Sequence, residues 1–523
     1  MWLDLDVLDP GSMSRDELVV LATDQAARIE EQAGVIARQG EQIAGMARQL
    51  AELDERFEQA AAKLARLEHL LSRNSDNSSF PSSKDGGPGG TPPPSKGRRA
   101  KPGGRAKGKQ PGAPGSALRW YEPGEVVLQD CFPQGPCPCG VDLAGGTDLG
   151  AVDRYQQHEI PLVSVTVTQY DLHAVACSCG KVHTAARPDG AGAARAGYGP
   201  QLQAFAVYLM VLHFVPVARC REILTALTGA EPSLGFVHGL LERVATVFAG
   251  VDRVIRTLIT LCFAVSCDET PLKVGPATPA QGKKEAKRYL LVACTDLYTH
   301  YLLGDRSIDT FKKFVFKDLR VDAVIVHDRY QNYDSAELGA LNHQLCLAHV
   351  LRDLKTAVEL HPDQAWPAQL AGEFRELIHR ANQARDRGER SVPARILAVP
   401  LRGLRAAVAI GLARTADLDD QRPGARKTRH LLEEIEQREP DFLRFTTDLR
   451  IPPTSNQAER DLRPSKIQEK ISGRLTSEDR TKDRYLIRGV LSTAIKHAAN
   501  PLTVLRDAFS GKFWLPPAAA AFT

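Results

Sequence analysis

The stretch Phe263-Ala-Val-Ser-Cys-Asp-Glu-Thr-Pro-Leu-Lys-Val274 is a short apolar run that meets two adjacent acids, Asp268 and Glu269. An apolar run of this length predicts a buried β-strand that ends at Asp268. In α/β sheets, ligands bind outside the C-terminal ends of the strands. One acid at a strand end is weak evidence for a site, so partners for Asp268 must come from elsewhere in the chain.

A second β-branched run, Asp322-Ala-Val-Ile-Val-His-Asp328, also ends in an aspartate. The segments between and after the two runs predict, in order, strands at 288–294 and 299–303, a helix at 309–317, a helix at 334–341 and a strand at 344–347. A meander between two strands that each end in Asp is the layout of an RNase H-like sheet. In such a sheet the two carboxylates meet across adjacent strands.

A third carboxylate follows a long helical region. Residues 350–450 show amphipathic helix patterns and no strand pattern, which predicts a helical insertion. The insertion ends at Ile451-Pro-Pro-Thr-Ser-Asn-Gln-Ala-Glu-Arg-Asp-Leu-Arg-Pro464, where Ser455 or Asn456 can cap a helix that carries Glu459. Lys466 lies two turns further along the same face.

Three carboxylates can hold two Mg²⁺ ions about 3.5–4 Å apart for phosphoryl transfer, and hard oxygen ligands suit Mg²⁺. Lys466, Arg460 and Arg463 could bind a phosphate beside them. Each acid taken alone is more often a surface acid or a helix cap. Strand-borne Asp268, strand-borne Asp328 and helix-borne Glu459 in this order are much less expected by chance.

The N-terminal region predicts a coiled coil over 14–72. An apolar residue recurs at every seventh position: Ile29, Ile36, Ile43, Leu50, Phe57, Leu64 and Leu71. The alternative is a long amphipathic helix packed on its own protein. Because the repeat outlasts most globular helices, we favour the coiled coil and therefore self-association.

Residues 73–117 form a Ser/Asn-rich and then Gly/Pro-rich linker that cannot build a core. Between Lys96 and Lys109 the linker carries seven Lys/Arg and no acid. The basic side chains expected to contact DNA phosphates are Arg98, Arg99, Lys101, Arg105 and Lys107. The alternative is a merely soluble linker.

Residues 118–190 contain two cysteine pairs, Cys137/Cys139 and Cys177/Cys179, with alternating valines at 163–167 that predict a strand between them. Four thiolates on two turns predict a small structural zinc module that binds DNA. The pairs leave one residue between ligands where zinc knuckles usually leave two. Cys131 or His183 could replace a strained ligand, and a metal-free module remains the alternative.

Residues 195–262 read as helices at 202–214, 217–227 and 234–248, the last capped by Ser233. Their spacing is that of a helix-turn-helix, a pattern also common in plain helical packing.

The length of the chain, 523 residues, predicts several domains. The chain has no long apolar run and no signal-peptide pattern, so we expect a cytoplasmic, nucleoid-associated protein that does not enter a membrane.

The motifs together resemble the bacterial insertion-sequence transposases of the IS sixty-six (IS66) family. The resemblance spans Arg73-Asn-Ser-Asp-Asn-Ser-Ser-Phe-Pro-Ser-Ser-Lys84, the basic tract and both cysteine pairs. It continues with Asp268-Glu-Thr270, Asp328-Arg-Tyr-Gln-Asn-Tyr333, Cys346-Leu-Ala-His349 and Asn456-Gln-Ala-Glu-Arg-Asp-Leu-Arg-Pro464. The last segment is the most specific. Cys346 and His349 could be a metal pair or could position the helical insertion.

The resemblance implies a DDE transposase with Asp268, Asp328 and Glu459 as Mg²⁺ ligands, element ends and target DNA as partners, and accessory proteins of the same element. It also favours Asp268 over Glu269, since strand alternation points the two side chains to opposite faces. The alternatives are an inactive or domesticated DNA-binding repressor and an RNase H-like nuclease. The expected units are the coiled coil 14–72, linker 73–117, zinc module 118–190, helical segment 195–262, first core part 263–350, insertion 351–450, second core part 451–500 and tail 501–523.

Overall fold

The computed structural model describes residues 14–72, 118–159, 163–187, 189, 194–276, 287–416 and 425–517. Its centre is a five-stranded mixed sheet in the order β5-β4-β3-β6-β7. The strands are β3 (Ala264–Leu272), β4 (Arg288–Cys294), β5 (Thr299–Gly304), β6 (Val324–His327) and β7 (Asn342–Leu345). β3, β6 and β7 run parallel, and β4 is antiparallel to both of its neighbours. The α/β class predicted from the sequence is confirmed.

The central strand, β3, ends at different residues on its two edges. Its parallel pairing with β6 runs from Ala264 to Ser266, whereas its antiparallel pairing with β4 continues to Leu272. The expectation that this strand ends at Asp268 is wrong, because β4 supplies hydrogen-bonding partners beyond that residue.

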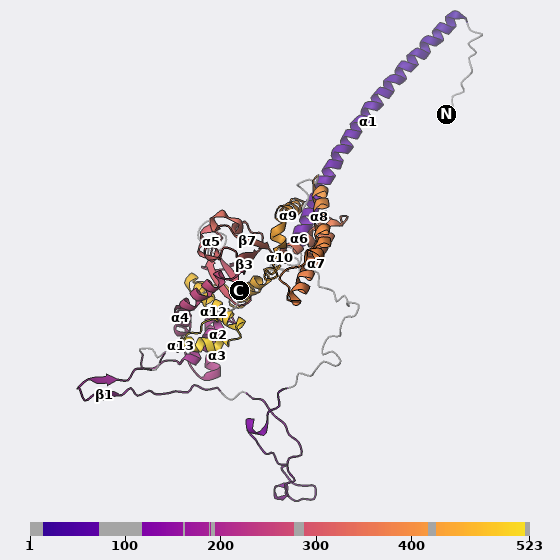
Figure 1. Cartoon of the computed structure of the whole chain (residues 1–523). Helices are drawn as coiled ribbons and strands as arrows, with labels where there is room; N and C mark the ends of the chain where they lie inside the picture. The colour runs from indigo at the N-terminus through magenta and orange to yellow at the C-terminus, as the bar shows by residue number, and fades with distance from the viewer. Residues whose placement is uncertain are drawn as a thin grey trace.

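Helices cover both faces of the sheet (Figure 1). On one face, Val265 and Leu291 pack in a core with α2 (Pro200–Val211), α3 (Val217–Thr228), α4 (Leu234–Thr260), α12 (Glu478–Lys496) and α13 (Pro501–Phe509). On the other face, Leu290 and Val292 pack against Ala458 and Leu462 of α11 (Asn456–Ser472). The helix that carries Glu459 therefore lies directly on the central strands.

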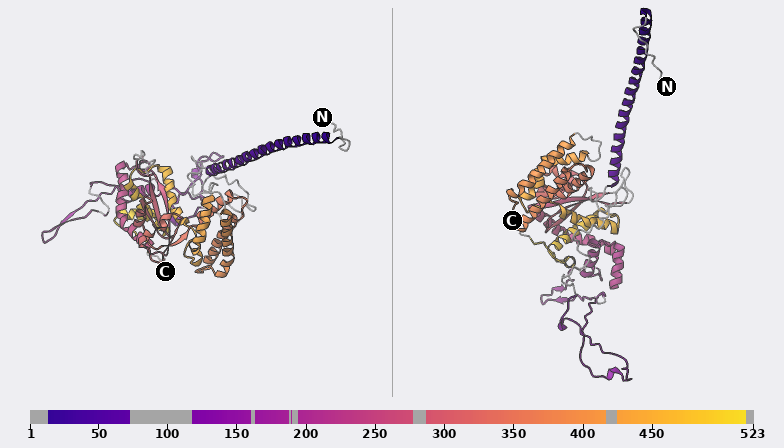
Figure 2. Two further views of the ribbon diagram at one scale, coloured as in Figure 1. Left: turned by 90° about the horizontal axis from the view of Figure 1, so that it is seen from above. Right: turned by 90° about the vertical axis from the view of Figure 1, so that its right-hand side faces the viewer.

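A second helical group has its own core beside the sheet (Figure 2). It comprises α6 (Leu347–Leu360), α7 (Trp366–Asp386), α8 (Ala394–Thr415), α9 (Ala425–Gln437) and α10 (Glu439–Thr447). Val324, Val326 and Leu345 connect this core to β6 and β7. Within the residues that the structure describes, this part of the chain is helical, as the sequence predicts.

Three local expectations are wrong. The valines at 163–167 lie in a loop, and the nearby hairpin is β1 (Ala174–Ala176) with β2 (Val182–Thr184) instead. The helix expected at 334–341 is replaced by two short 3₁₀ turns, η6 (Gln331–Asp334) and η7 (Ala336–Leu338), and Gly339 at φ +93° ends the second. The helix expected at 309–317 ends early, as α5 (Ile308–Lys313) followed by η5 (Phe316–Asp318).

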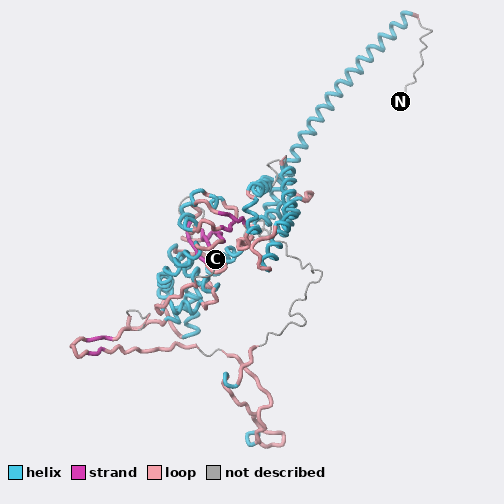
Figure 3. The backbone as a smooth tube through the Cα atoms, in the orientation of Figure 1, coloured by secondary structure: helices cyan, strands magenta, loops and turns pink. Residues whose placement is uncertain are grey.

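The N-terminal part is extended. α1 (Arg15–Ser72) is one continuous helix that projects away from the sheet and helices (Figure 1). Residues 118–159 and 163–187 are mostly loop apart from the β1–β2 hairpin and two 3₁₀ turns, η3 (Pro123–Glu125) and η4 (Leu143–Gly145) (Figure 3). The linker expected at 73–117 lies outside the described residues.

Two helices, α4 and α8, are long and apolar enough to cross a membrane by length and composition alone. Each buries one face in a core of the protein, as core helices of soluble proteins also do. No membrane protein is indicated.

Candidate active site

The two aspartates predicted as a pair come from neighbouring strands. The parallel register pairs Ala264 with Val324 and Ser266 with Val326. Continuing that register by two residues sets Asp268 opposite Asp328, the first residue after β6. Local sequence alone could not give this register, which depends on how β3 and β6 pair.

The surroundings of Asp268 are electrostatically unbalanced. Its side chain is half-buried, and burial together with the charges of Glu269 and Asp328 raises the pKa of Asp268 well above its ordinary range. The charge of His349 acts in the opposite direction. Asp268 accepts a hydrogen bond from the Glu269 amide at 2.8 Å, and Asp328 accepts one from the Tyr330 amide at 2.9 Å. Clustered carboxylates with a raised pKa are typical of metal and catalytic sites.

Glu459 lies in the first turn of α11 and faces α6. Its carboxylate accepts a hydrogen bond from Arg352 at 2.8 Å and lies 3.9 Å from Nε2 of His349. His349 therefore lies beside Glu459, and its charge also acts on Asp268.

The carboxylate oxygens of Asp268, Asp328 and Glu459 do not all lie within 4.8 Å of one another in this structure. Among the described residues, one group of three His, Cys, Asp or Glu has its ligand atoms within 4.8 Å of one another, and that group is His327, Asp334 and His343. In this structure Glu459 is held by Arg352 instead. Glu459 would have to exchange this ion pair for a cation to complete a three-carboxylate site.

Sequence reasoning left the role of Cys346 and His349 open and did not single out Arg352. The Cys346 Sγ accepts a hydrogen bond from the Ser455 amide at 3.2 Å, one residue before α11. Burial alone would lower the pKa of His349, but its hydrogen bond to Cys346 and the charge of that thiolate outweigh burial and raise the pKa to about 9. His349, whose pKa is raised, thus lies next to Glu459.

Glu269 points to the other face of β3, as alternation predicts. Its buried carboxylate accepts hydrogen bonds from the Tyr333 hydroxyl at 2.9 Å and from Arg306 at 2.5 Å. Burial and the charge of Asp328 raise the pKa of Glu269, while Arg306 opposes the shift. Glu269 therefore connects β3 to the segment after β6 through hydrogen bonds. This structural role was not predicted from the sequence.

The predicted phosphate-binding cations of α11 lie on the helix that carries Glu459. Lys466 contacts the Pro271 carbonyl of β3 and lies 3.5 Å from Glu469. Arg460 and Arg463 are exposed, and Arg460 donates to Gln457 at 2.7 Å. The basic residues predicted in the linker, Arg98, Arg99, Lys101, Arg105 and Lys107, lie outside the described residues.

The two cysteine pairs adopt the same turn. In each, the first cysteine amide donates to the carbonyl four residues on, at 2.7 Å for Cys137 and 2.8 Å for Cys177, and a glycine with positive φ follows the second cysteine. Cys139 and Cys179 complete the pairs on exposed loops. The four thiols do not form a group with all ligand atoms within 4.8 Å among the described residues. The structural zinc site stays a prediction.

The family model described as "Transposase IS66 family" matches residues 195–483, which is more than half of the chain and includes Asp268, Asp328 and Glu459. A search of curated proteins found no match. The resemblance read from the motifs is thus confirmed at the level of the family: the chain belongs to the IS66 family of transposases.

Proposed function

We propose that this transposase is of the DDE type and that it cleaves the ends of its element and joins them to target DNA with Mg²⁺. The observation that carries the proposal is the pairing of β3 with β6, whose register sets Asp268 opposite Asp328. Glu459 of α11 would complete the set, and it lies beside His349, whose charge acts on Asp268.

The sheet supports an RNase H-like core. Its order, β5-β4-β3-β6-β7, places the two Asp-bearing strands side by side although a meander separates them in the chain. α11 packs across the central strands, so a carboxylate in its first turn can approach the same edge. These are the features that a three-carboxylate phosphoryl-transfer site requires.

The donor set fits divalent cations. Three carboxylates offer the hard oxygen ligands that Mg²⁺ prefers. Burial and the negative charges of Glu269 and Asp328 raise the pKa of Asp268, and a bound cation would offset both effects. Ions bound there would lower the pKa of the attacking water or 3′-hydroxyl and stabilise the leaving oxygen. Asp268 and Asp328 would hold the ions, and Glu459 would join them on release from Arg352.

The remaining charged parts fit DNA as the substrate. Arg460 and Arg463 present exposed cations on α11 near the carboxylates, where they would hold phosphates of an element end. The basic linker would add contacts without sequence preference, and α1 would bring two chains together on two ends. Zinc at the cysteine pairs and accessory proteins of the element belong to the same proposal.

The test is a cleavage and joining assay with DNA that carries both element ends. Asp268→Asn, Asp328→Asn and Glu459→Gln should each lower Mg²⁺-dependent cleavage about 10²-fold or more while end binding is retained. Asp322→Asn is the matched control, because Asp322 lies on the same segment as Asp328 but its side chain is 58% exposed and pairs with Arg320.

Three outcomes would contradict the proposal. Normal cleavage by any one of the three variants would disprove the assignment of that residue. Cleavage without joining would favour a nuclease, and specific binding without cleavage by the parent protein would favour a DNA-binding repressor.

A further inference from the structure

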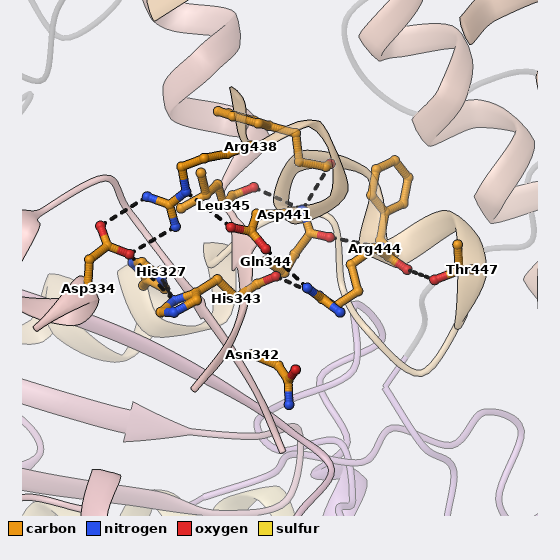
Figure 4. Close-up of polar contacts among 12 residues, drawn as sticks. His327, Asp334, Asn342, His343, Gln344, Leu345, Arg438, Asp441, Arg444 and Thr447 are labelled. Atoms are coloured by element: carbon orange, nitrogen blue, oxygen red, sulfur yellow. Dashed lines mark hydrogen bonds and ion pairs between the residues drawn. The ribbon is translucent and has the colours of Figure 1, made fainter. Parts of the chain in front are cut away.

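A second cluster of side chains that can bind a metal comprises His327, Asp334 and His343 (Figure 4), and His327 directly precedes Asp328 in the chain. His327 ends β6, His343 lies in β7, and Asp334 ends η6. Nε2 of His327 is 2.9 Å from Nδ1 of His343, and an Asp334 carboxylate oxygen is 3.8 Å from the same Nδ1. All three ligand atoms lie within 4.8 Å of one another.

We propose that His327, His343 and Asp334 bind one transition-metal ion, with Zn²⁺ the best fit to the donor set. Two imidazoles and one carboxylate leave a fourth position for water in a tetrahedral site. Imidazole nitrogen suits Zn²⁺ and its neighbours in the transition series, whereas Mg²⁺ prefers oxygen ligands. Two nitrogens bound to one tetrahedral zinc lie about 3.3 Å apart, so the rings need to separate by only a few tenths of an ångström.

The outer contacts already orient the carboxylate and hold the backbone of one histidine. Arg438 donates to both oxygens of Asp334, each at 2.9 Å, and also to Asp441 at 3.1 Å. Each Asp334 oxygen keeps a lone pair for a metal, and a hydrogen-bonded carboxylate is the usual arrangement around a metal ligand. Arg444 donates to the His343 carbonyl at 2.8 Å, which fixes β7 against α10. The charge of Arg438 is shared between Asp334 and Asp441 and does not leave the cluster positive.

Exposure to solvent increases across the cluster. His327 is fully buried, the His343 side chain is 15% exposed and that of Asp334 is 37% exposed. Asp334 is therefore the ligand most accessible to an ion, and His327 is the least accessible. The competing explanation is a plain hydrogen bond in which one imidazole donates to the other, and it predicts no metal.

A bound ion would cross-link β6, β7 and η6. His327 directly precedes Asp328, and Asp334 closes the turn that follows it. The ion would thus fix the backbone on both sides of Asp328. This consequence for cleavage rests on the proposed function, whereas the metal site itself does not.

The test measures metal in the full chain after chelation and reloading with Co²⁺ or Zn²⁺. Because the cysteine pairs could also bind these ions, the parent for this test carries Cys177→Ser and Cys179→Ser. We expect about one tightly bound Co²⁺ per chain with tetrahedral visible absorption and no thiolate charge-transfer band.

The decisive variant is His343→Asn, because an Asn oxygen can stand close to the Nδ1 position and keep a hydrogen bond to His327 while being a poor zinc ligand. It should weaken metal binding by more than the about 10–100-fold that loss of an outer-shell partner costs. It should also abolish the rise in melting temperature that Zn²⁺ gives the parent. His430→Asn, at an exposed position of α9, is the matched control and should bind as the parent does.

Equal binding by His343→Asn and the parent overturns the proposal, as does a parent that binds no Co²⁺ or gives only a weak octahedral spectrum. If His343→Asn fails to fold, Asp334→Asn at the more exposed ligand carries the same test. Metal content and melting temperature do not depend on DNA cleavage, so failure here is distinct from failure of the proposed function.

Discussion

Asp268 and Glu269 are adjacent in the chain but belong to two different environments. Glu269 is enclosed by Arg306 and Tyr333, which neutralise and bond its carboxylate. Burial and the charges of Glu269 and Asp328 raise the pKa of Asp268, while the charge of His349 and the hydrogen bond from the Glu269 amide oppose the rise. A pair of acids with contrasting surroundings is a common way for a protein to separate a structural carboxylate from a chemically active one.

The cysteines divide into reactive and inert thiols, which gives a test of the zinc module. Hydrogen bonds from the Val141 amide and from Cys137 lower the pKa of Cys139, and those from Cys179 lower the pKa of Cys177. Burial raises the pKa of Cys220 and of Cys262 to about 11. Since the thiolate reacts, alkylation near neutral pH should modify the exposed pairs first and the buried thiols last.

Mass spectrometry after brief alkylation measures this order. As the pH is raised, alkylation of Cys139 and Cys177 should accelerate at a lower pH than alkylation of ordinary thiols. Added Zn²⁺ should protect all four paired cysteines. If zinc leaves their alkylation unchanged, these residues do not form a zinc site.

At the scale of elements, α11 is held by a buried ion pair. The Asp461 carboxylate accepts hydrogen bonds from Lys496 of α12 at 2.9 Å and from Thr299 of β5 at 3.0 Å. Both charged side chains are nearly enclosed, at 9% and 11% exposure. Asp461 lies two residues after Glu459, so this pair fixes the helix turn that carries the third carboxylate.

Lys496→Met should lower the free energy of unfolding by about 3–5 kcal/mol, because it leaves a buried charge without a partner. Lys482→Met, in the same helix but at an exposed pair with Glu478, should cost about 0.5 kcal/mol or less. Urea denaturation measures both. Adding Asp461→Asn to Lys496→Met should recover part of the loss, and equal effects of the two lysine variants would contradict the role of the buried pair.

The heptad face of α1 is open to solvent from Ile29 to Leu53, the part whose side chains the structure describes. The seam residues that are each more than half exposed are Ile29, Ile36, Ile43, Met46, Leu50 and Leu53. A long row of exposed aliphatic side chains on a single helix favours packing against a second copy.

Ile36→Glu with Ile43→Glu should convert an oligomer to a monomer, as measured by light scattering after gel filtration. Arg38→Glu with Arg48→Glu changes the charge of the same helix away from the seam and should leave the mass unchanged. An unchanged mass for the Ile variants would show that α1 does not carry self-association.

Elements were predicted correctly from the sequence where the local hydrophobic pattern agrees with the packing. The predictions were wrong where pairing with distant segments determines the structure. Strands 288–294 and 299–303 were found almost residue for residue, because each is a β-branched or apolar run bounded by turns. The valines at 163–167 have the same pattern but no neighbouring strand, and β-propensity without a paired strand does not make a sheet. At 334–341, Ser335 and Gly339 limit the segment to a 3₁₀ turn.

The same reason limits what could be predicted of the site. Asp268, Asp328 and Glu459 stand out because each follows or begins a recognisable element. Arg352, which holds Glu459, does not stand out, because α6 and α11 meet only through long-range contacts such as the Leu347 amide with the Pro453 carbonyl at 3.0 Å. No local pattern reports a contact between segments so far apart in the chain.

Across the whole molecule, the candidate active site lies where the sheet and the helical insertion meet. β3 and β6 supply two carboxylates, α11 supplies the third, and α6 of the insertion supplies Arg352 and His349. A small shift of the insertion relative to the sheet would change whether Glu459 pairs with Arg352 or with a cation. DNA binding near this junction could therefore be coupled to assembly of the site.

The central claim is that Asp268 binds the catalytic ions directly, and Asp268→Cys tests it most simply. A thiolate binds Mg²⁺ poorly and accepts softer ions such as Mn²⁺. The account predicts that this variant is inactive in Mg²⁺ and regains measurable cleavage of element ends in Mn²⁺, while the parent protein cleaves in both. Cleavage in Mg²⁺ at the parent rate would contradict the account, and so would a folded, DNA-binding variant that Mn²⁺ fails to rescue.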